Sequence, residues 1–222
     1  MPHPDGSYWF TDPPYGGQLY EGTPDAPGGP SNPTGGSSIG SDSRPRSRTS
    51  SASCPRPCIA SIRAVASTRW SAKTSCPNPN GLTFSPDYKK LYVISTGPGP
   101  GDKGPGGKRD MHVFDVGADN KLSNQKLFSD FMVDGIKCGP DGARCDIDGN
   151  VWVSSNGNPG GRGLGYSGVT VWTPEGKLIG RIRLPEVCAN IAFGGPKRNR
   201  LFMCGSQSLY ALYVNTQGAA PS

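Results

Sequence analysis

The sequence predicts an all-β fold built from repeated antiparallel four-stranded units, and three observations support this. The 222 residues include 33 Gly and 23 Pro, and only 33% are apolar, which favours many turns over long helices. A polar turn followed by an alternating apolar strand occurs four times, in "HPDGSYWFTDP", "SPDYKKLYVIST", "DIDGNVWVSSN" and "GPKRNRLFMCGS". The third observation is their spacing, 60 residues from Tyr92 to Trp152 and 50 from Trp152 to Phe202. Radially repeated four-stranded sheets at such spacing predict a β-propeller.

Each unit extends this plan in order. The first, near the N-terminus, has no second hairpin after it. The second continues into "HVFDVGADNKLSNQKLF" and the third into "VTVWTPEGKLIGRI", each a strand, a turn and a strand. The fourth closes with "SLYALYV". We therefore expect a partial blade over 1–35, an anomalous segment over 36–77, propeller blades over 78–217 and a tail over 218–222.

The net charge of +6 is confined to one segment. Residues 36–77 hold one acidic residue, Asp42, and seven basic ones: Arg44, Arg46, Arg48, Arg56, Arg63, Arg69 and Lys73. The other residues carry 16 basic and 16 acidic groups, so the predicted blades are neutral and no nucleic-acid partner is indicated. No run approaches a membrane span and no secretory segment opens the chain. We expect a soluble, cytoplasmic protein with no membrane partner, a periplasmic or secreted location remaining open.

Residues 36–77 are rich in Ser and Arg and have no period of 2 or 3.6, so we expect them to be irregular. Two origins are open. The segment can be a low-complexity insertion. Alternatively, residues 57–77 can be back-translated and read two bases on as "VYRIDPRSGEHEVVSEDFLP", which restores the strand, turn and strand that the first unit lacks. We favour a frameshifted segment that begins after Thr34 and ends just before Asn78.

Three of the seven cysteines lie in the anomalous segment; Cys138, Cys145, Cys188 and Cys204 lack CxxC spacing, and we expect buried thiols. The sequence holds no complete EF-hand loop and no phosphate-binding Gly-x4-Gly-Lys motif, and "GYSGV" is not a Gly-x-Ser-x-Gly motif. With only His3 and His112 as imidazole bases, a Ser-His-Asp hydrolase is disfavoured.

Taken in order, "PNGLTFSPDYKKLYV", "GPDGARCDIDGNVWVS", "GVTVWTPEGKLIGRIRLPE" and "FGGPKRNRLFMCGSQSLYAL" resemble the gluconolactonase and regucalcin (senescence marker protein) family. "DGSYWFTDPPYG" resembles its bacterial gluconolactonase branch. The resemblance covers residues 3 to about 30 and 78–217. It implies a six-bladed propeller with a divalent metal on its axis and lactone-hydrolysing activity. About four blades are expected here, with the first two and the native N-terminus missing.

The resemblance also implies site residues. Asp141 of "GPDGARCD" matches the family's aspartate ligand, and Asn80 of "NPNGL" matches an asparagine ligand. Such oxygen ligands suit Ca²⁺ best, with Zn²⁺, Mg²⁺ or Mn²⁺ as alternatives. Asp141 is also the expected catalytic base. The family's remaining ligands, a glutamate and a second asparagine, have no counterpart in this sequence.

Other interpretations of these site residues remain open. Pro-Asp-Gly and Pro-Asn-Gly are also common turn tripeptides, and Asp134 of "VDGIKC" is a rival for Asp141. Asp12 and Tyr15 of "FTDPPYG" are candidates for binding sugar hydroxyls, although a turn explains them equally well.

The leading functional hypothesis is a metal-dependent hydrolase of sugar lactones. A non-catalytic propeller fragment is the main alternative, and an organophosphate or ester hydrolase is a further one. Open blade edges also predict non-specific self-association.

Overall fold

The computed structural model describes residues 1–12, 58–63, 66–70, 76, 79–96, 109–157 and 166–219. For residues 12, 58–63 and 66–70 it describes the backbone alone. Every regular element in these ranges is a β-strand, which confirms the predicted all-β fold. None of the described stretches forms a helix that is long and apolar enough to cross a membrane.

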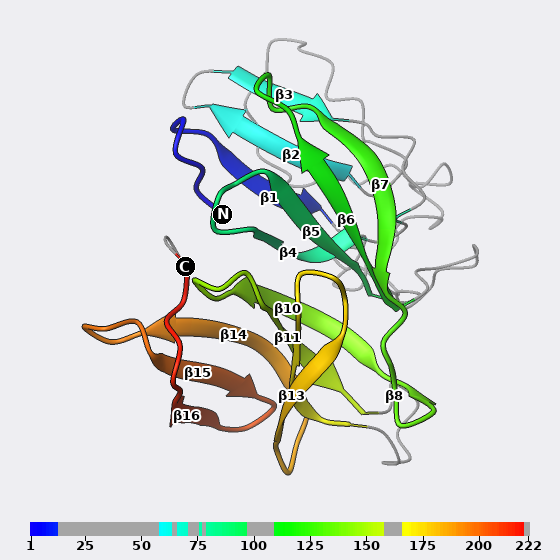
Figure 1. Ribbon diagram of the computed structural model, residues 1–222, viewed down its shortest axis with the longest axis vertical. Helices are drawn as coiled ribbons and strands as arrows, with labels where there is room; N and C mark the ends of the chain where they lie inside the picture. The colour runs from blue at the N-terminus through cyan, green and yellow to red at the C-terminus, as the bar shows by residue number, and fades with distance from the viewer. Residues whose placement is uncertain are drawn as a thin grey trace, which may run out of the picture.

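Four antiparallel sheets form a partial propeller (Figure 1), and in each sheet strands that follow one another along the chain are neighbours. The first contains β1 (Tyr8–Asp12), β2 (Cys58–Arg63) and β3 (Ala66–Trp70). The second contains β4 (Pro79–Phe84), β5 (Lys90–Ser95), β6 (Asp110–Val116) and β7 (Leu122–Ser129). The third contains β10 (Gly139–Cys145), β11 (Val151–Asn156), β12 (Gly168–Trp172) and β13 (Leu178–Arg183). The fourth contains β14 (Cys188–Gly194), β15 (Arg200–Gly205) and β16 (Leu209–Tyr213), and a short hairpin of β8 (Met132–Val133) and β9 (Ile136–Lys137) links the second and third.

The first strands of the four sheets are neighbours in space. β1 contacts β4, β4 contacts β10, and β10 contacts β14. Figure 1 shows β4 and β10 side by side where the second and third sheets meet. Residues at corresponding ends of these inner strands can therefore meet although they are far apart in the sequence.

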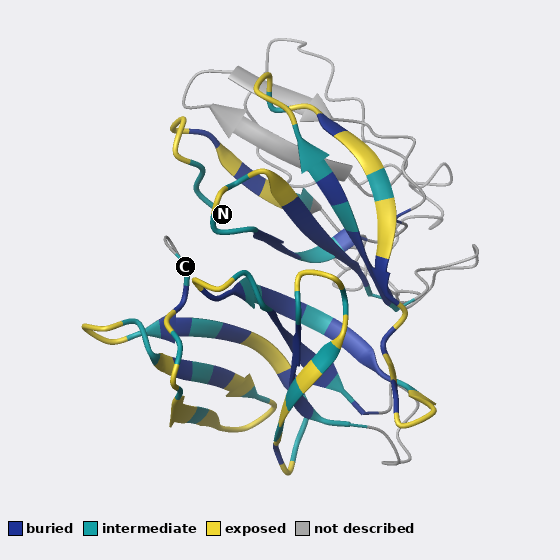
Figure 2. Cartoon of the chain, in the orientation of Figure 1, coloured by how far each residue is buried: buried dark blue, intermediate teal, exposed yellow. Residues whose placement is uncertain are grey.

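The hydrophobic cores lie between successive sheets, because the second strand of a blade buries both of its faces. In β5, Leu91 and Val93 pack toward the first sheet, whereas Tyr92 and Ile94 pack toward the third. The two faces alternate because side chains along a strand point to opposite sides. β11 repeats the pattern, and Figure 2 shows the buried inner strands and the exposed outer ones.

Strands β2 and β3 correct the expectation that residues 36–77 are irregular. β2 pairs in antiparallel register with β1, from Tyr8↔Ile62 to Asp12↔Cys58, and β3 pairs with β2. Both strands carry β-branched residues, which favour strands, and β1 offers an edge on which they can pair. The rest of the segment, apart from Cys76, lies outside the described residues, and its origin remains a hypothesis.

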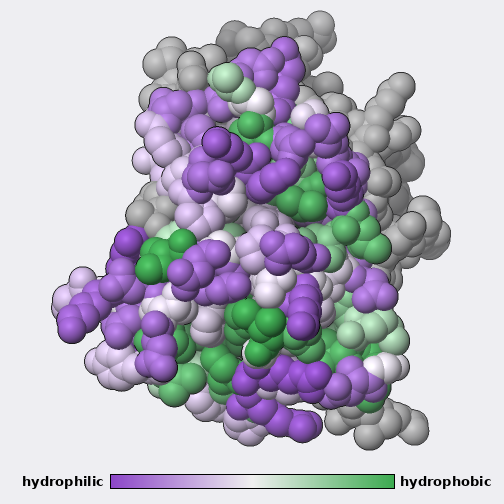
Figure 3. All heavy atoms as spheres, in the orientation of Figure 1, coloured by the Kyte–Doolittle hydropathy of each residue, from purple (hydrophilic) through white to green (hydrophobic). Residues whose placement is uncertain are grey.

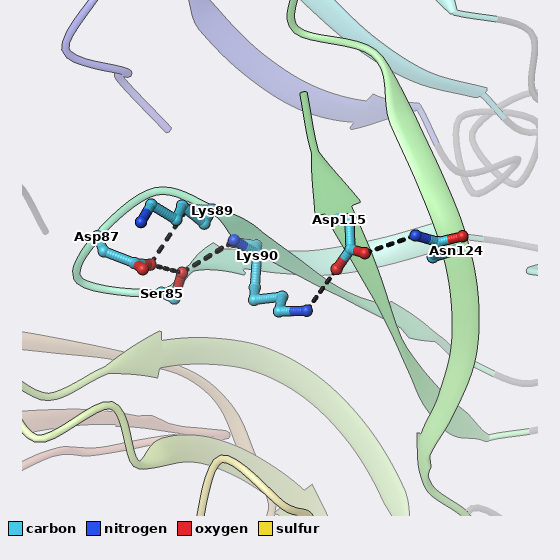
Figure 4. A network of polar contacts seen from close by, with 6 residues as sticks. All are labelled: Ser85, Asp87, Lys89, Lys90, Asp115 and Asn124. Atoms are coloured by element: carbon cyan, nitrogen blue, oxygen red, sulfur yellow. Dashed lines mark hydrogen bonds and ion pairs between the residues drawn. The ribbon is translucent and has the colours of Figure 1, made fainter. Parts of the chain in front are cut away.

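A polar turn and a row of cross-strand contacts hold the outside of the second sheet (Figure 4). Ser85 Oγ donates to Asp87 Oδ1 (2.6 Å), and the Lys90 backbone N–H donates to Ser85 Oγ (3.0 Å). Across the sheet, the Lys90 ammonium donates to Asp115, and Asn124 Nδ2 donates to its other carboxylate oxygen (2.8 Å). The predicted turn after β4 is thus a hydrogen-bonded corner.

The fourth sheet ends in an exposed strand. Leu209 and Tyr213 on β16 are each 69% exposed, and Leu212 is 44% exposed. The face in Figure 3 likewise combines hydrophilic areas with separate apolar patches. Exposed apolar area at a sheet edge favours association, so self-association stays a prediction.

Candidate functional site

Asp141 lies in a strand rather than in a turn. Pro140 pairs with Ser155 and Ala143 with Val153, and the register of β10 shifts between these two pairs. Such a β-bulge bends a strand and re-aims the side chains within it. Asp141 and Gly142 occupy the shifted positions, so the turn interpretation of Pro-Asp-Gly does not hold.

Asn80 reaches the same place from the neighbouring blade. It lies in β4, whose register shifts between Pro79 and Leu82 in the same way. Its Nδ2 donates a 2.7 Å hydrogen bond to Asp141 Oδ1, across 61 residues of sequence. Both side chains are partly buried. The structure therefore brings together the two residues that the family resemblance assigns to one metal site.

Two glycines make this close approach possible. A Cβ atom on Gly81 would lie less than 3.0 Å from the Asp141 carbonyl oxygen. A Cβ atom on Gly142 would lie less than 3.0 Å from the Asn190 amide. Glycine is needed at both positions because backbone approaches backbone or a side chain there, and not because of a turn conformation.

Hydroxyl groups fix the backbone around the pair. Ser154 accepts a hydrogen bond from the Gly142 N–H (2.7 Å) and donates one to the Ala189 carbonyl oxygen (3.0 Å). Thr11 of β1 donates to the Asn80 carbonyl oxygen. Ser154 is fully buried. Its two hydrogen bonds connect the Asp141 bulge to the start of β14.

Burial raises the pKa of the Asp141 carboxyl above its ordinary value, and the hydrogen bond from Asn80 opposes this shift. Burial also raises the pKa of Cys188, at the start of β14, to about 11, with a smaller contribution from the negative charge of Asp141. A partly desolvated carboxylate is favoured by a positive charge beside it.

The side-chain oxygens of Asn80 and Asp141 are suitable ligands for a hard divalent cation. Asp141 Oδ2 and Asn80 Oδ1 accept no hydrogen bond from the described residues, and carboxylate and amide oxygens are ligands that Ca²⁺ and Mg²⁺ prefer. Among the described residues, no group of three or more His, Cys, Asp or Glu side chains is arranged to hold a metal. Asn80 and Asp141 would therefore hold a cation together with waters, a substrate or groups outside the described residues.

The Asp-Gly steps at residues 5, 134 and 148 are turns, and Gly6 has φ 85°. Asp134 and Gly135 both have positive φ (54° and 76°) and connect β8 to β9. Asp134 is exposed and forms a two-pronged ion pair with Arg181, one of whose contacts is 2.8 Å. Gly149 has φ 84° in the turn before β11. Asp134 therefore lies away from Asn80 and is not part of the pair.

The remaining predicted site residues are less informative. Asp12 ends β1, next to Thr11, and its side chain is not described. Tyr15 lies outside the described residues. The sequence analysis missed two residues at this site, Ser154 and Asn190. A serine inside the apolar run "VWVSS" was an available signal for Ser154, because a buried hydroxyl needs partners.

Comparisons with known proteins show which family the chain resembles. The family model described as the SMP-30/Gluconolactonase/LRE-like region matches residues 62–207. Lactonohydrolase oryL from Aspergillus oryzae is 30% identical over 158 residues, which cover 64% of this chain and 32% of that protein.

Two solved structures resemble the chain. A gluconolactonase from Xanthomonas campestris has a TM-score of 0.61 at 27% identity, covering 96% of this chain and 55% of that one. A calcium-binding protein, regucalcin, from Agrobacterium tumefaciens has a TM-score of 0.54 at 22% identity, covering 75% and 54%. The chain thus spans about a third of the length of the curated relative and just over half of these structures. Since the family model matches more than half of its residues, the chain belongs to the SMP-30/gluconolactonase/LRE-like family.

Proposed function

We propose that this chain is part of a metal-dependent hydrolase of sugar lactones. The observation that carries the proposal is the meeting of Asn80 and Asp141 at the starts of two neighbouring inner strands. The names of the relatives, lactonohydrolase and gluconolactonase, support a lactone as the substrate class.

The cation that best suits the pair is Ca²⁺, and the calcium-binding neighbour from Agrobacterium supports this choice. Oxygen donors also accept Mg²⁺ or Mn²⁺, and Zn²⁺ is tolerated. When bound, a divalent cation polarises a lactone carbonyl and lowers the pKa of an attacking water.

Asp141 and Asn80 have different roles in the proposed reaction. The Asp141 carboxylate, which would also hold the cation, takes the proton of the attacking water. Asn80 fixes the Asp141 carboxylate through its 2.7 Å hydrogen bond to Oδ1. Partial burial of Asp141 limits the access of bulk water to its carboxylate.

The test is hydrolysis of glucono-1,5-lactone, followed as acid release above the spontaneous rate with and without a chelator. We expect chelator-sensitive turnover that falls by about 100-fold or more in Asp141→Asn, since a general base contributes about 10²–10⁴-fold. Asp134→Asn is the matched control, because it removes an aspartate from an Asp-Gly step that lies in a surface turn.

The outcomes separate the candidate functions. Equal losses in the two variants would contradict the assignment to Asp141. The absence of both metal binding and chelator-sensitive turnover would favour a non-catalytic propeller. One observation favours that alternative, namely that the described residues supply only one acidic ligand at the pair.

A further inference from the structure

Asn190 lies beside the Asn80–Asp141 pair, on the inner strand of the next blade. It belongs to β14, which contacts β10, and its amide lies against Gly142, the residue after Asp141. The register of β14 shifts between Cys188 and Asn190, near the start of the strand, as it does in β4 and β10. Three neighbouring blades therefore place a bulge, and the side chains it re-aims, at the same end of their inner strands.

The two ends of the Asn190 amide have different surroundings. Oδ1 accepts a 2.9 Å hydrogen bond from the Ile191 N–H and lies next to Gly142. Nδ2 donates to no group among the described residues, and Asn190 is exposed. Because Oδ1 is held by the Ile191 N–H, the amide presents two unused N–H donors to solvent close to Gly142, the residue after Asp141.

The backbone that carries Asn190 is fixed relative to Asp141. Ser154 bridges Gly142 and Ala189, which are the immediate neighbours of Asp141 and Asn190 along their strands. A donor held at a constant position beside a carboxylate and an amide oxygen suits a ligand that offers several acceptor oxygens. The hydroxyl, ring and carbonyl oxygens of a sugar lactone are such acceptors.

We propose that Asn190 positions the lactone by donating a hydrogen bond from Nδ2 to one of its oxygens. The inference rests on the proposed function, because it assigns a substrate contact to the same site. Asn190 does not act on the reacting bond. It contributes to binding and to the choice of substrate, so its loss raises KM and leaves kcat within about twofold.

The test measures binding of glucono-1,5-lactam, a non-hydrolysable analogue, by calorimetry in the presence of Ca²⁺. Asn190→Ala removes both ends of the amide. Asn190→Asp keeps an acceptor for the Ile191 N–H and removes the donors. We expect both variants to bind the lactam about tenfold more weakly, the effect of one neutral hydrogen bond of ordinary strength. Asn190→Ala should retain Ca²⁺ affinity within about twofold, and Asn215→Ala, at an exposed asparagine in the loop after β16, should change neither value.

Three results would overturn the inference. If neither variant weakens lactam binding, Asn190 is not a substrate contact. If Asn190→Ala weakens it and Asn190→Asp does not, Asn190 acts through the Ile191 hydrogen bond and its role is structural. If the unmodified chain binds Ca²⁺ but no lactam, the substrate class in the proposed function fails with it, whereas the first two results leave that function intact.

Discussion

Replacing Ser154 with alanine tests how the inner strands are held together. The change removes two hydrogen bonds, from the Gly142 N–H (2.7 Å) and to the Ala189 carbonyl oxygen (3.0 Å). Gly142 is buried, so its N–H is left without a partner, which costs about 1–3 kcal/mol. Ala189 is exposed, so water can replace the second bond at little cost. We therefore expect Ser154→Ala to lower the free energy of unfolding by about 1–3 kcal/mol.

Urea unfolding followed by tryptophan fluorescence measures this loss, and Ser129→Ala is the matched control. Ser129 Oγ likewise accepts a hydrogen bond from a buried backbone N–H, that of Phe131 (3.1 Å), but it lies in β7. We expect a similar loss of stability in both variants. Ca²⁺ affinity should fall about tenfold in Ser154→Ala alone, because groups that orient metal ligands typically have effects of this size.

A loss below about 0.5 kcal/mol in Ser154→Ala would refute the reasoning, since it would mean that the Gly142 N–H finds another partner. Equal effects on Ca²⁺ affinity in the two variants would show that Ser154 has no specific connection with Asp141.

Three further predictions follow from the packing of the blades. Gly142→Ala should destabilise the chain by about 2–3 kcal/mol in urea unfolding, because its Cβ atom would collide with the Asn190 amide; unchanged stability would show that β10 and β14 can separate freely. Iodoacetamide at pH 8 should modify the exposed Cys204 well before Cys145, because burial raises the pKa of Cys145 to about 12; equal labelling in peptide maps would mean that the second and third sheets open readily. Exposed leucine and tyrosine side chains on β16 should make the chain oligomeric or poorly soluble; a monomer in light scattering at high concentration would contradict this.

The sequence has four Asp-Gly steps, and those at residues 134, 141 and 148 can be ranked as candidate sites because each has different neighbours. Asp148-Gly149 leads directly into the alternating strand of β11 and forms a turn there. Asp141-Gly142 sits within a longer motif that resembles the family, and the structure places it in a strand. The repeats also predict which residues face which core, because a period of two is a local property of a strand.

Other features depend on contacts between blades, which no local pattern reveals. Asn190 and Ser154 join the site only because β10 and β14 pack together. Strands β2 and β3 form where composition predicts irregular chain, because the edge of β1 is available to pair with them. In each case the partner is distant in sequence, so packing decides the outcome.

Calorimetric titration of the chain with CaCl₂ tests the assignment of Asn80 and Asp141 most directly. We expect one ion per chain, with an affinity that falls about tenfold or more in Asn80→Ala and in Asp141→Asn, since each removes an oxygen ligand. Asp134→Asn should leave the affinity unchanged, because that carboxylate pairs with Arg181 on the surface. An affinity that is the same in all three variants, or no binding by the unmodified chain, would contradict the proposed metal centre.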